Sequence, residues 1–463
     1  MATSAAGTAQ IHPSKALGFL TLGSSIYDVL TCLRLHSRVF PTISVIYDST
    51  TPLSAPVILS LDDNGLRLRF DGADQRLRLI EVLDFQKSRL SYNGGELARA
   101  GAATGASGPT FRSIYNKLFG PTYPGEYMKD QGVYVLSYPG VAFSFPVNKG
   151  VWKEDVDFVS LLSASNAQPA SSMAIFSGSS WSESRNDLFT KPTSNPRSPG
   201  INSASARLSS ANDEIELIRL HDDHKVELVR RHNAPFTVTL HLTTPQDLVA
   251  ELGPPSAKYR KNDHRLSIHR GTRSISGRAQ DDTDDTEPDE PQSGDDEDVS
   301  DVSATSNSDY FLNYFQHGFD VFISSSRSSS HPVATKIILH GNVPGSFEFQ
   351  RYRRSRWTIE LPENSKNKEL RLNSEMVFDE ALPRLRERFG EVQRPMLLNR
   401  GSDSPSSSCE LLGGWEDGEV GDKAPGGHLT GPEGTFGNTE LFGFPGFIFE
   451  VLKNRAISSL TVF

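Results

Sequence analysis

Apolar residues recur along the chain first with helical and then with strand spacing, and the clearest case begins at Thr244. Thr244 fits the N-cap of a helix and Pro245 its first turn, while Leu248 and Leu252 fall on one helical face. Gly253 is expected to end this helix in a left-handed conformation, because the proline that follows forbids its continuation. A helix this short does not persist alone, so we expect it to pack on a sheet.

Strand spacing is clearest in two segments near the N-terminus. In residues 66–70 and 76–80 every second side chain is apolar, which predicts strands with one buried face and one solvent-exposed face. The pair Asn64-Gly65, which precedes the first of these strands, predicts a hairpin with a two-residue turn. We therefore expect antiparallel strands in this part of the chain.

The same order of a short helix followed by alternating strands occurs four times. In the last three copies the helix ends in Leu or Phe followed by glycine, at Gly120, Gly253 and Gly390, and an aromatic strand with its own turn glycine comes later. The first copy is looser and begins with a helix-like stretch over 26–36. The pattern predicts an α+β fold of four small units, each a short helix on antiparallel strands, merged into one or two lobes.

Breaks in this pattern suggest the boundaries of the units. We expect the four units over the following residues: 18–150 for the first two, 213–270 and 308–362 for the third, and 376–463 for the fourth. Three polar tracts show neither helical nor strand spacing. They are predicted to be disordered, as a Ser/Pro-rich linker over 160–212, an acidic insert over 271–307 and a Gly/Ser-rich insert over 399–437.

The formal charge of −10 comes from one short segment. Residues 281–301 carry twelve Asp and Glu side chains and no Lys or Arg, and removing those twelve charges leaves +2. Mutual repulsion favours a solvated insert there. A calcium loop is not favoured, because Glu287 and Ser293 stand where an EF-hand has Gly and Glu. The near-neutral remainder, without a recognition helix, predicts that nucleic acid is not a partner.

The sequence is typical of a cytoplasmic protein. No run approaches about 18 uncharged apolar residues, so no transmembrane segment is predicted, and the N-terminus lacks the apolar stretch of a secretory signal. Two cysteines cannot build a disulfide framework. Cys32 falls in an apolar helix and is interpreted as a small core residue, and Cys409 has no neighbour that would activate it.

Motifs that carry common enzymatic chemistry do not occur in the sequence. There is no GxxxxGK[ST] phosphate loop, no GxSxG elbow, and no CxxC or HExxH metal motif. His221 and His224 could share a helix face, but a solvated polar segment is the favoured interpretation. We therefore predict no catalytic, cofactor-binding or metal-binding residue, and an unrecognised hydrolase or transferase is only the third hypothesis.

One basic segment suggests a binding role. Four arginines and two aromatic residues lie within residues 351–357, after an expected strand. Alternating side chains would place several of the arginines on one face, where they could bind phosphoinositide headgroups with a tryptophan at the membrane interface. The candidate residues are Arg351, Arg353, Arg354, Arg356 and Trp357. The alternative is a charged sheet edge that discourages aggregation.

Several of these segments resemble the phagosome assembly factor one family. The resemblance is carried by SDYFLNYFQHGFDVFI (308–323), TKIILHGNVPGSFEF (335–349), LDDNGLRLRFDGADQRLRLIEV (61–82) and the closing FIFEVLKNRAISSLTVF. The predicted inserts and the strongly basic residues 351–356 depart from the family's pattern.

The resemblance implies a function that the residues alone do not. It implies a non-enzymatic scaffold or adaptor in early autophagy, which acts at the phagophore assembly site with a β-propeller partner related to breast carcinoma amplified sequence three. An older assignment of the family implies the alternative, a phosphoinositide-binding factor of Golgi and secretory traffic. We therefore expect a cytoplasmic adaptor that is recruited to forming autophagic membranes.

Overall fold

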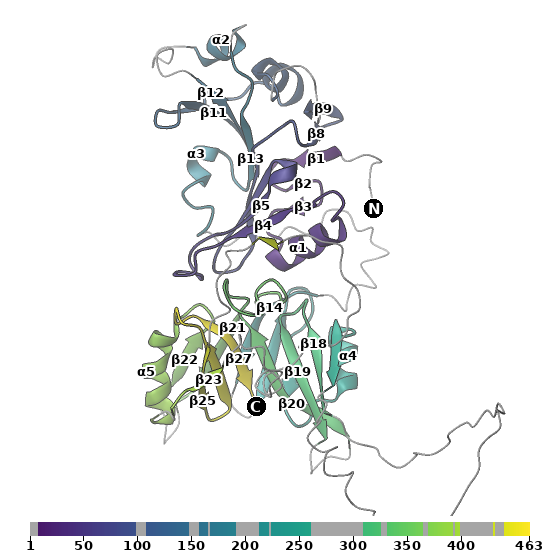
Figure 1. Cartoon of the computed structure of the whole chain (residues 1–463), viewed down its shortest axis with the longest axis vertical. Helices are drawn as coiled ribbons and strands as arrows, with labels where there is room; N and C mark the ends of the chain where they lie inside the picture. The colour runs from purple at the N-terminus through teal and green to yellow at the C-terminus, as the bar shows by residue number, and fades with distance from the viewer. Residues whose placement is uncertain are drawn as a thin grey trace, which may run out of the picture.

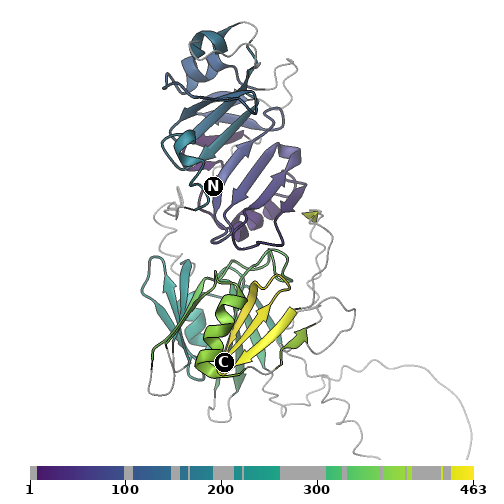
Figure 2. The same ribbon diagram turned by 90° about the vertical axis from the view of Figure 1, so that its left-hand side faces the viewer.

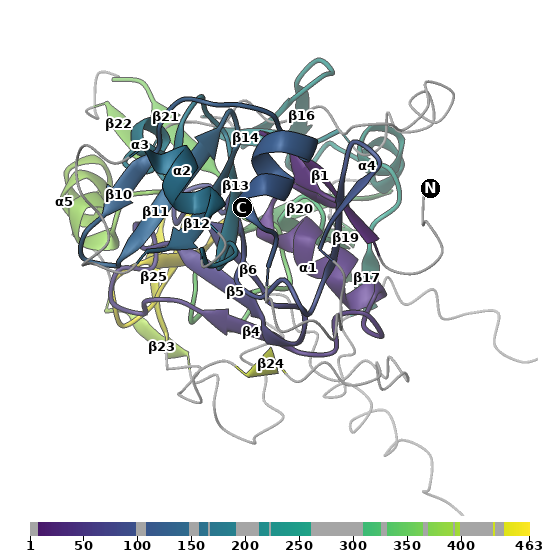
Figure 3. The same cartoon turned by 90° about the horizontal axis from the view of Figure 1, so that it is seen from above.

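The computed structural model describes residues 8–98, 108–147, 157–164, 167–190, 213–221, 224–260, 309–325, 331–363, 369–391, 394–398, 429–430 and 439–463. These residues form two lobes, the N lobe (8–190) and the C lobe (213–463, except 429–430). The lobes are stacked end to end, with α1 (Ile26–Leu35) on the side of the N lobe that faces the C lobe (Figure 1). In the view rotated by 90° about the vertical axis, the lobes again lie above and below a single junction (Figure 2). Seen from above, the N lobe covers much of the C lobe (Figure 3).

The N lobe begins with three short strands, followed by two helix-plus-strand units. Its elements are β1 (Thr8–His12), β2 (Ala16–Leu17), β3 (Leu20–Thr21), α1, β4 (Ile43–Ile46), β5 (Val57–Leu61), the 3-10 turn η1 (Asp62–Asn64), β6 (Leu66–Phe70), β7 (Leu77–Val82), β8 (Arg89–Tyr92), β9 (Gly95–Ala98), the π-helical turn η2 (Ser113–Leu118), β10 (Glu126–Met128), β11 (Val133–Tyr138), β12 (Val141–Pro146), α2 (Phe158–Ser163), β13 (Ser172–Phe176) and α3 (Trp181–Ser184).

The C lobe follows the same order of strands and helices. Its elements are β14 (Ile215–Leu220), β15 (Lys225–Arg230), β16 (Phe236–Thr239), α4 (Pro245–Leu252), β17 (Ala257–Arg260), β18 (Tyr310–Tyr314), β19 (Phe319–Ser325), β20 (Pro332–His340), β21 (Trp357–Leu361), β22 (Leu370–Asn373), α5 (Phe378–Phe389), β23 (Met396–Leu398), β25 (Thr439–Phe444), β26 (Phe447–Val451) and β27 (Ile457–Val462). The two-residue strand β24 (Leu429–Thr430) pairs instead with β4 of the N lobe.

Each lobe contains two sheets with matching strand orders. The large sheets run β10-β11-β12-β13-β7-β6-β5-β4-β24 and β17-β18-β19-β20-β27-β26-β25-β23, so each joins two four-stranded meanders through their last strands. The joining pairs β13–β7 and β20–β27 are antiparallel. The small sheets run β3-β2-β1-β8-β9 and β16-β15-β14-β21-β22, each with a central parallel pair. The predicted α+β fold of four units is confirmed, and the units form two lobes of one topology.

The helix-ending glycines occupy equivalent positions in the last three units. Gly120, Gly253 and Gly390 have φ values of 86°, 79° and 87°, a region that residues with a Cβ rarely adopt. In α4 the Thr244 side chain accepts from the Asp247 amide, and the Asp247 side chain accepts from that of Thr244, which completes a capping box. The predicted helix over this segment is confirmed.

Two predictions about the first unit need correction. Gly65 has φ 63°, but β5 and β6 are joined by a four-residue loop that includes η1, because Leu61 pairs with Leu66. The turn is therefore longer than the predicted two residues. The strand β7 does not have one solvent-exposed face, since Arg78 is buried and its Nε lies 2.7 Å from Asp71 Oδ2. This strand lies inside the large sheet and is covered on both faces.

The expected linker over 160–212 contains regular structure. The described part of this tract holds most of α2, all of β13 and α3. Met173 and Ile175 of β13 are buried in the N-lobe core, and the strand completes the second meander. β13 is short and follows many Ser residues, so its strand spacing is hidden in the sequence. Residues 191–212, the insert 271–307 and most of 399–437 lie outside the described residues, although β24 falls in the last of them.

Candidate functional site at the lobe junction

Within the described residues, one loop of the C lobe contacts the N lobe through several side chains. Residues 341–356, here called the junction loop, connect β20 to β21 and lie below α1 (Figure 1). The loop faces α1 and the N-lobe turn 71–76, which connects β6 to β7. The junction therefore brings together segments about three hundred residues apart in the sequence.

A pair of buried amides lies at the centre of the junction. Gln75 Nε2 donates to the Asn342 backbone carbonyl at 2.7 Å, and Asn342 Nδ2 donates to Gln75 Oε1 at 2.6 Å. Each residue is 1% exposed and has positive φ, 54° for Gln75 and 46° for Asn342. Such backbone conformations persist where surrounding interactions hold them, so the two amides fix the turn and the loop against each other.

Ion pairs surround this amide pair. Arg353 of the junction loop lies 2.6 Å from Asp28 of α1 and 3.4 Å from Glu214, and Glu214 also pairs with Arg76 of the N lobe. Burial alone would raise the pKa of Asp28, but Arg353, together with the Ser25 hydrogen bond and the charge of Arg76, outweighs burial and the pKa is lowered. Arg356 adds a further contact between the lobes, at 2.9 Å from Asp74.

Apolar contacts extend the junction. The rings of Tyr47 in the N lobe and Phe349 in the junction loop pack edge to face at 5.4 Å. Leu53 packs against a small C-lobe cluster that contains Val343 and Leu452. The lobes thus share polar and apolar contacts, although each has its own core.

A buried polar cluster supports the junction loop from below. The Tyr352 hydroxyl donates to Asp320 Oδ2 at 2.8 Å, and His340 Nε2 lies 3.0 Å from the same carboxylate. The rings of His340 and Tyr352 stack at 3.8 Å. Burial, followed by the charge of Asp320, raises the pKa of Tyr352. All three side chains are almost fully buried, so the cluster positions the loop and offers no access to a substrate.

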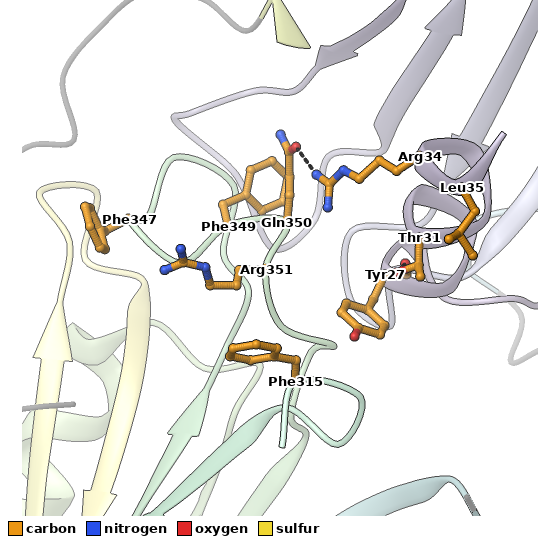
Figure 4. Close-up of a pocket in the computed structure, with 9 residues that line it drawn as sticks. All are labelled: Tyr27, Thr31, Arg34, Leu35, Phe315, Phe347, Phe349, Gln350 and Arg351. Atoms are coloured by element: carbon orange, nitrogen blue, oxygen red, sulfur yellow. Dashed lines mark hydrogen bonds between the residues drawn. The ribbon is translucent and has the colours of Figure 1, made fainter. Parts of the chain in front are cut away.

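A groove of about 610 Å³ opens between α1 and the junction loop (Figure 4). One wall comes from α1 and the other from the C lobe, with Phe315 from the turn between β18 and β19. The residues that line it are Tyr27, Thr31, Arg34, Leu35, Phe315, Phe347, Phe349, Gln350 and Arg351. Arg34 reaches across the groove and donates from Nη2 to Gln350 Oε1 at 3.4 Å.

The structure distributes the five predicted lipid-binding residues over different environments. Residues 351–356 form no strand, so the alternation expected for them does not apply. Arg351 is exposed and lines the groove, whereas Arg353 and Arg356 form the ion pairs described above. Arg354 is buried and donates to the Gly341 carbonyl, and burial lowers its pKa to about 10. Trp357 is buried at the start of β21.

The other residues considered in the sequence analysis are the helix-ending glycines, His221 and the two cysteines. Gly120, Gly253 and Gly390 end helical segments. His221 Nε2 lies 3.0 Å from Glu227. Cys32 is partly exposed in α1, where burial raises its pKa, and Cys409 lies outside the described residues. Within the described ranges, no group of three or more His, Cys, Asp or Glu side chains could hold a metal ion.

Sequence reasoning missed most of the junction. Asp28, Gln75, Glu214 and Asn342 were not singled out, and only their positions in polar turns or on a helix surface could have drawn attention to them. Leu35 had a clearer signal in the sequence, since it falls off the apolar face of the helix that Ile26, Val29, Leu30 and Leu33 form, and in the structure it is 76% exposed. No helix in the described parts of the chain is long and apolar enough to cross a membrane.

Comparison with known proteins places the chain in a family. The chain is 25% identical to a PHAF1 protein of Arabidopsis thaliana over 98% of its length and 92% of the relative's, and 24% identical to one of Drosophila melanogaster over 98% and 93%. A PHAF1 protein of Caenorhabditis elegans is 25% identical over 85% of both chains. No solved structure matches significantly. The profile of phagosome assembly factor 1 matches residues 16–284 and 296–463. The chain therefore belongs to the phagosome assembly factor 1 family.

Proposed function

We propose that the protein is a non-enzymatic scaffold or adaptor in phagophore assembly. Membership of the phagosome assembly factor 1 family is the observation that carries this proposal, because the family match extends over both lobes. The family's description is that of an assembly factor and supports a role in phagosome assembly. A scaffold acts by presenting surfaces that partners bury on binding.

The arrangement of the lobes supports a scaffold role. Two lobes of one topology are held together by the Gln75–Asn342 amide pair and by the ion pairs of Arg353 and Arg356. Paired buried polar groups fix geometry, since leaving one of them unpaired is costly. The two lobes are therefore held in a fixed arrangement, one above the other (Figure 2).

The proposed partner is a β-propeller protein related to breast carcinoma amplified sequence three, with which the chain would be recruited from the cytoplasm to the phagophore. The alternative is a phosphoinositide-binding factor of Golgi traffic. An adaptor is favoured over it, because Arg353, Arg354 and Trp357 are used in internal contacts, which leaves Arg351 as the main exposed member of the basic segment.

The proposal is tested with the full-length tagged chain and the purified propeller protein. We expect the immobilised chain, but not the tag alone, to retain the propeller protein. In starved cells that lack the endogenous chain, the tagged chain should gather at phagophores together with the propeller protein. A chain that retains no propeller protein and stays diffuse on starvation contradicts the proposal.

A further inference from the structure

We propose that the groove between α1 and the junction loop docks an acidic segment of the partner that carries a large apolar side chain. This inference rests on the proposed function, since the partner is the propeller protein. The groove is lined by residues of both lobes, so the docked segment would contact the N lobe and the C lobe at once (Figure 4).

Half-buried phenylalanine rings and an exposed leucine make this groove suited to a peptide. Phe315, Phe347 and Phe349 line the C-lobe side, and Leu35 on α1 is 76% exposed. Next to Leu35 in the chain, His36 carries the exposed ring of Phe19, which stacks on it at 5.5 Å. A large apolar side chain buried among aromatic rings is a typical anchor of a protein interface. The shape and lining of the groove therefore account for the apolar part of the ligand.

The charges of the groove account for its acidic part. Arg34 and Arg351 are the charged lining residues, and no carboxylate lines the groove. Within the described residues Arg34 has no carboxylate partner, whereas Arg353 in the same junction contacts two. Desolvation lowers the pKa of Arg34. Burial also lowers the pKa of Arg351, while the charges of Tyr352 and Glu348 act in the opposite direction. A carboxylate near Arg34 would gain a charge-assisted hydrogen bond.

A peptide segment explains the lining better than a lipid headgroup does. A headgroup is polar on all sides, whereas the groove is lined by three half-buried phenylalanine rings and by Leu35, which is 76% exposed. Headgroup recognition also relies on clusters of several cations, whereas Arg34 and Arg351 are the only two among the nine residues that line the groove. The same groove fits a short segment that places one apolar side chain between the walls and an acidic one beside Arg34.

The test compares the affinity of the purified propeller protein for the full-length chain and for groove variants. We expect Arg34→Glu and Leu35→Ser each to weaken binding about tenfold or more, as for central interface residues. The charge-matched control is Arg89→Glu, an exposed residue at the start of β8, which lies away from the junction. The apolar control is Leu242→Ser, a residue 71% exposed on the turn before α4. Both controls should bind like wild type, and wild-type binding should weaken with added salt.

The possible outcomes separate this inference from the proposed function. If wild type does not bind the propeller protein, the proposed function fails. If wild type binds and both groove variants bind equally well, only the groove assignment is overturned. If Arg34→Glu binds the propeller protein more tightly than wild type, the groove assignment is overturned. The occupant of the groove would then be the chain's own acidic segment 281–301. The groove variants are also tested for binding to phosphoinositide vesicles. If they lose binding to the vesicles but bind the propeller protein as wild type does, the groove assignment is overturned in favour of a lipid headgroup.

Discussion

Arg353 shows how single side chains connect the lobes. Its guanidinium reaches Asp28 of α1 and also lies near Glu214, and these two carboxylates outweigh the effect of burial, so the pKa of Arg353 is raised. On His317, which lies in the turn between β18 and β19, burial prevails: the Leu252 backbone and the charges of Asp213 and Glu214 raise the pKa by less than burial lowers it. Burial and the nearby Arg353 charge lower the pKa of His317 to about 4. This histidine therefore folds in its neutral form.

We predict that His317 makes stability depend on pH. An unfolded histidine takes up a proton near pH 6.5, whereas folded His317 does so only near pH 4. Its contribution is therefore complete above pH 6.5 and is lost as pH falls toward 4, by about 3 kcal/mol at most. His317→Phe should reduce the loss of unfolding free energy between pH 7 and 4.5, measured by urea denaturation. His232→Phe is the control for an exposed histidine. An unchanged pH dependence in His317→Phe contradicts the prediction.

At the scale of elements, turn glycines repeat in every unit but have different surroundings. Gly318, between β18 and β19, and Gly390, after α5, have almost the same φ, 84° and 87°. A Cβ at Gly390 would meet nothing within 4 Å. A Cβ at Gly318 would lie 2.6 Å from Ser355 Oγ and closer still to the Arg353 carbonyl. The hairpin β18–β19 is thus packed directly against the junction loop.

We predict that alanine substitutions at these two glycines distinguish the free-energy cost of backbone strain from the cost of displacing the junction loop. Gly390→Ala should lower the free energy of unfolding by about 1 kcal/mol, through the positive φ alone. Gly318→Ala should cost about 2 kcal/mol more, because the junction loop must move to admit the methyl group. Chemical denaturation of both variants measures the difference. Equal costs for the two variants would show that the loop is not held tightly against this turn.

The whole molecule consists of two separate cores joined by a polar junction. The N-lobe and C-lobe clusters of buried apolar residues are distinct, and the Gln75–Asn342 pair is a fully buried contact between the lobes. Unpaired buried amides are costly, typically about 1–3 kcal/mol each. The junction therefore couples the stability of the lobes and keeps both walls of the groove in place.

We predict that Asn342→Ala uncouples the lobes. The change removes both side-chain hydrogen bonds of Asn342 and leaves Gln75 Oε1 without its donor. Calorimetry should show one cooperative unfolding transition for wild type and two for the variant. Asn454→Ala is the matched control, because it removes an exposed hydrogen bond between the lobes, to the Ser49 carbonyl. A single transition at the wild-type temperature in Asn342→Ala would show that other contacts couple the lobes.

Features that depend on neighbours in sequence were predictable. The helix from Pro245 to Leu252 has its cap, its apolar face and its terminating glycine within ten residues, and all are present in the structure. The strand β13 and the burial of Arg78 were not predictable, because both depend on partners brought in by the sheet. For the site, the sequence drew attention to Arg351, which lines the groove, but the hypothesis grouped it with residues that have other partners.

The sequence alone determined the four repeated units, since helix periodicity, strand alternation and terminating glycines are local properties of the chain. It also carried the resemblance that the family match confirmed. Only the tertiary structure decided the pairing of units into two lobes and the junction between them. Gln75 and Asn342 are 267 residues apart and Asp28 and Arg353 are 325 apart. No local pattern records such contacts, because they exist only after both lobes have folded and buried their charges and amides against each other.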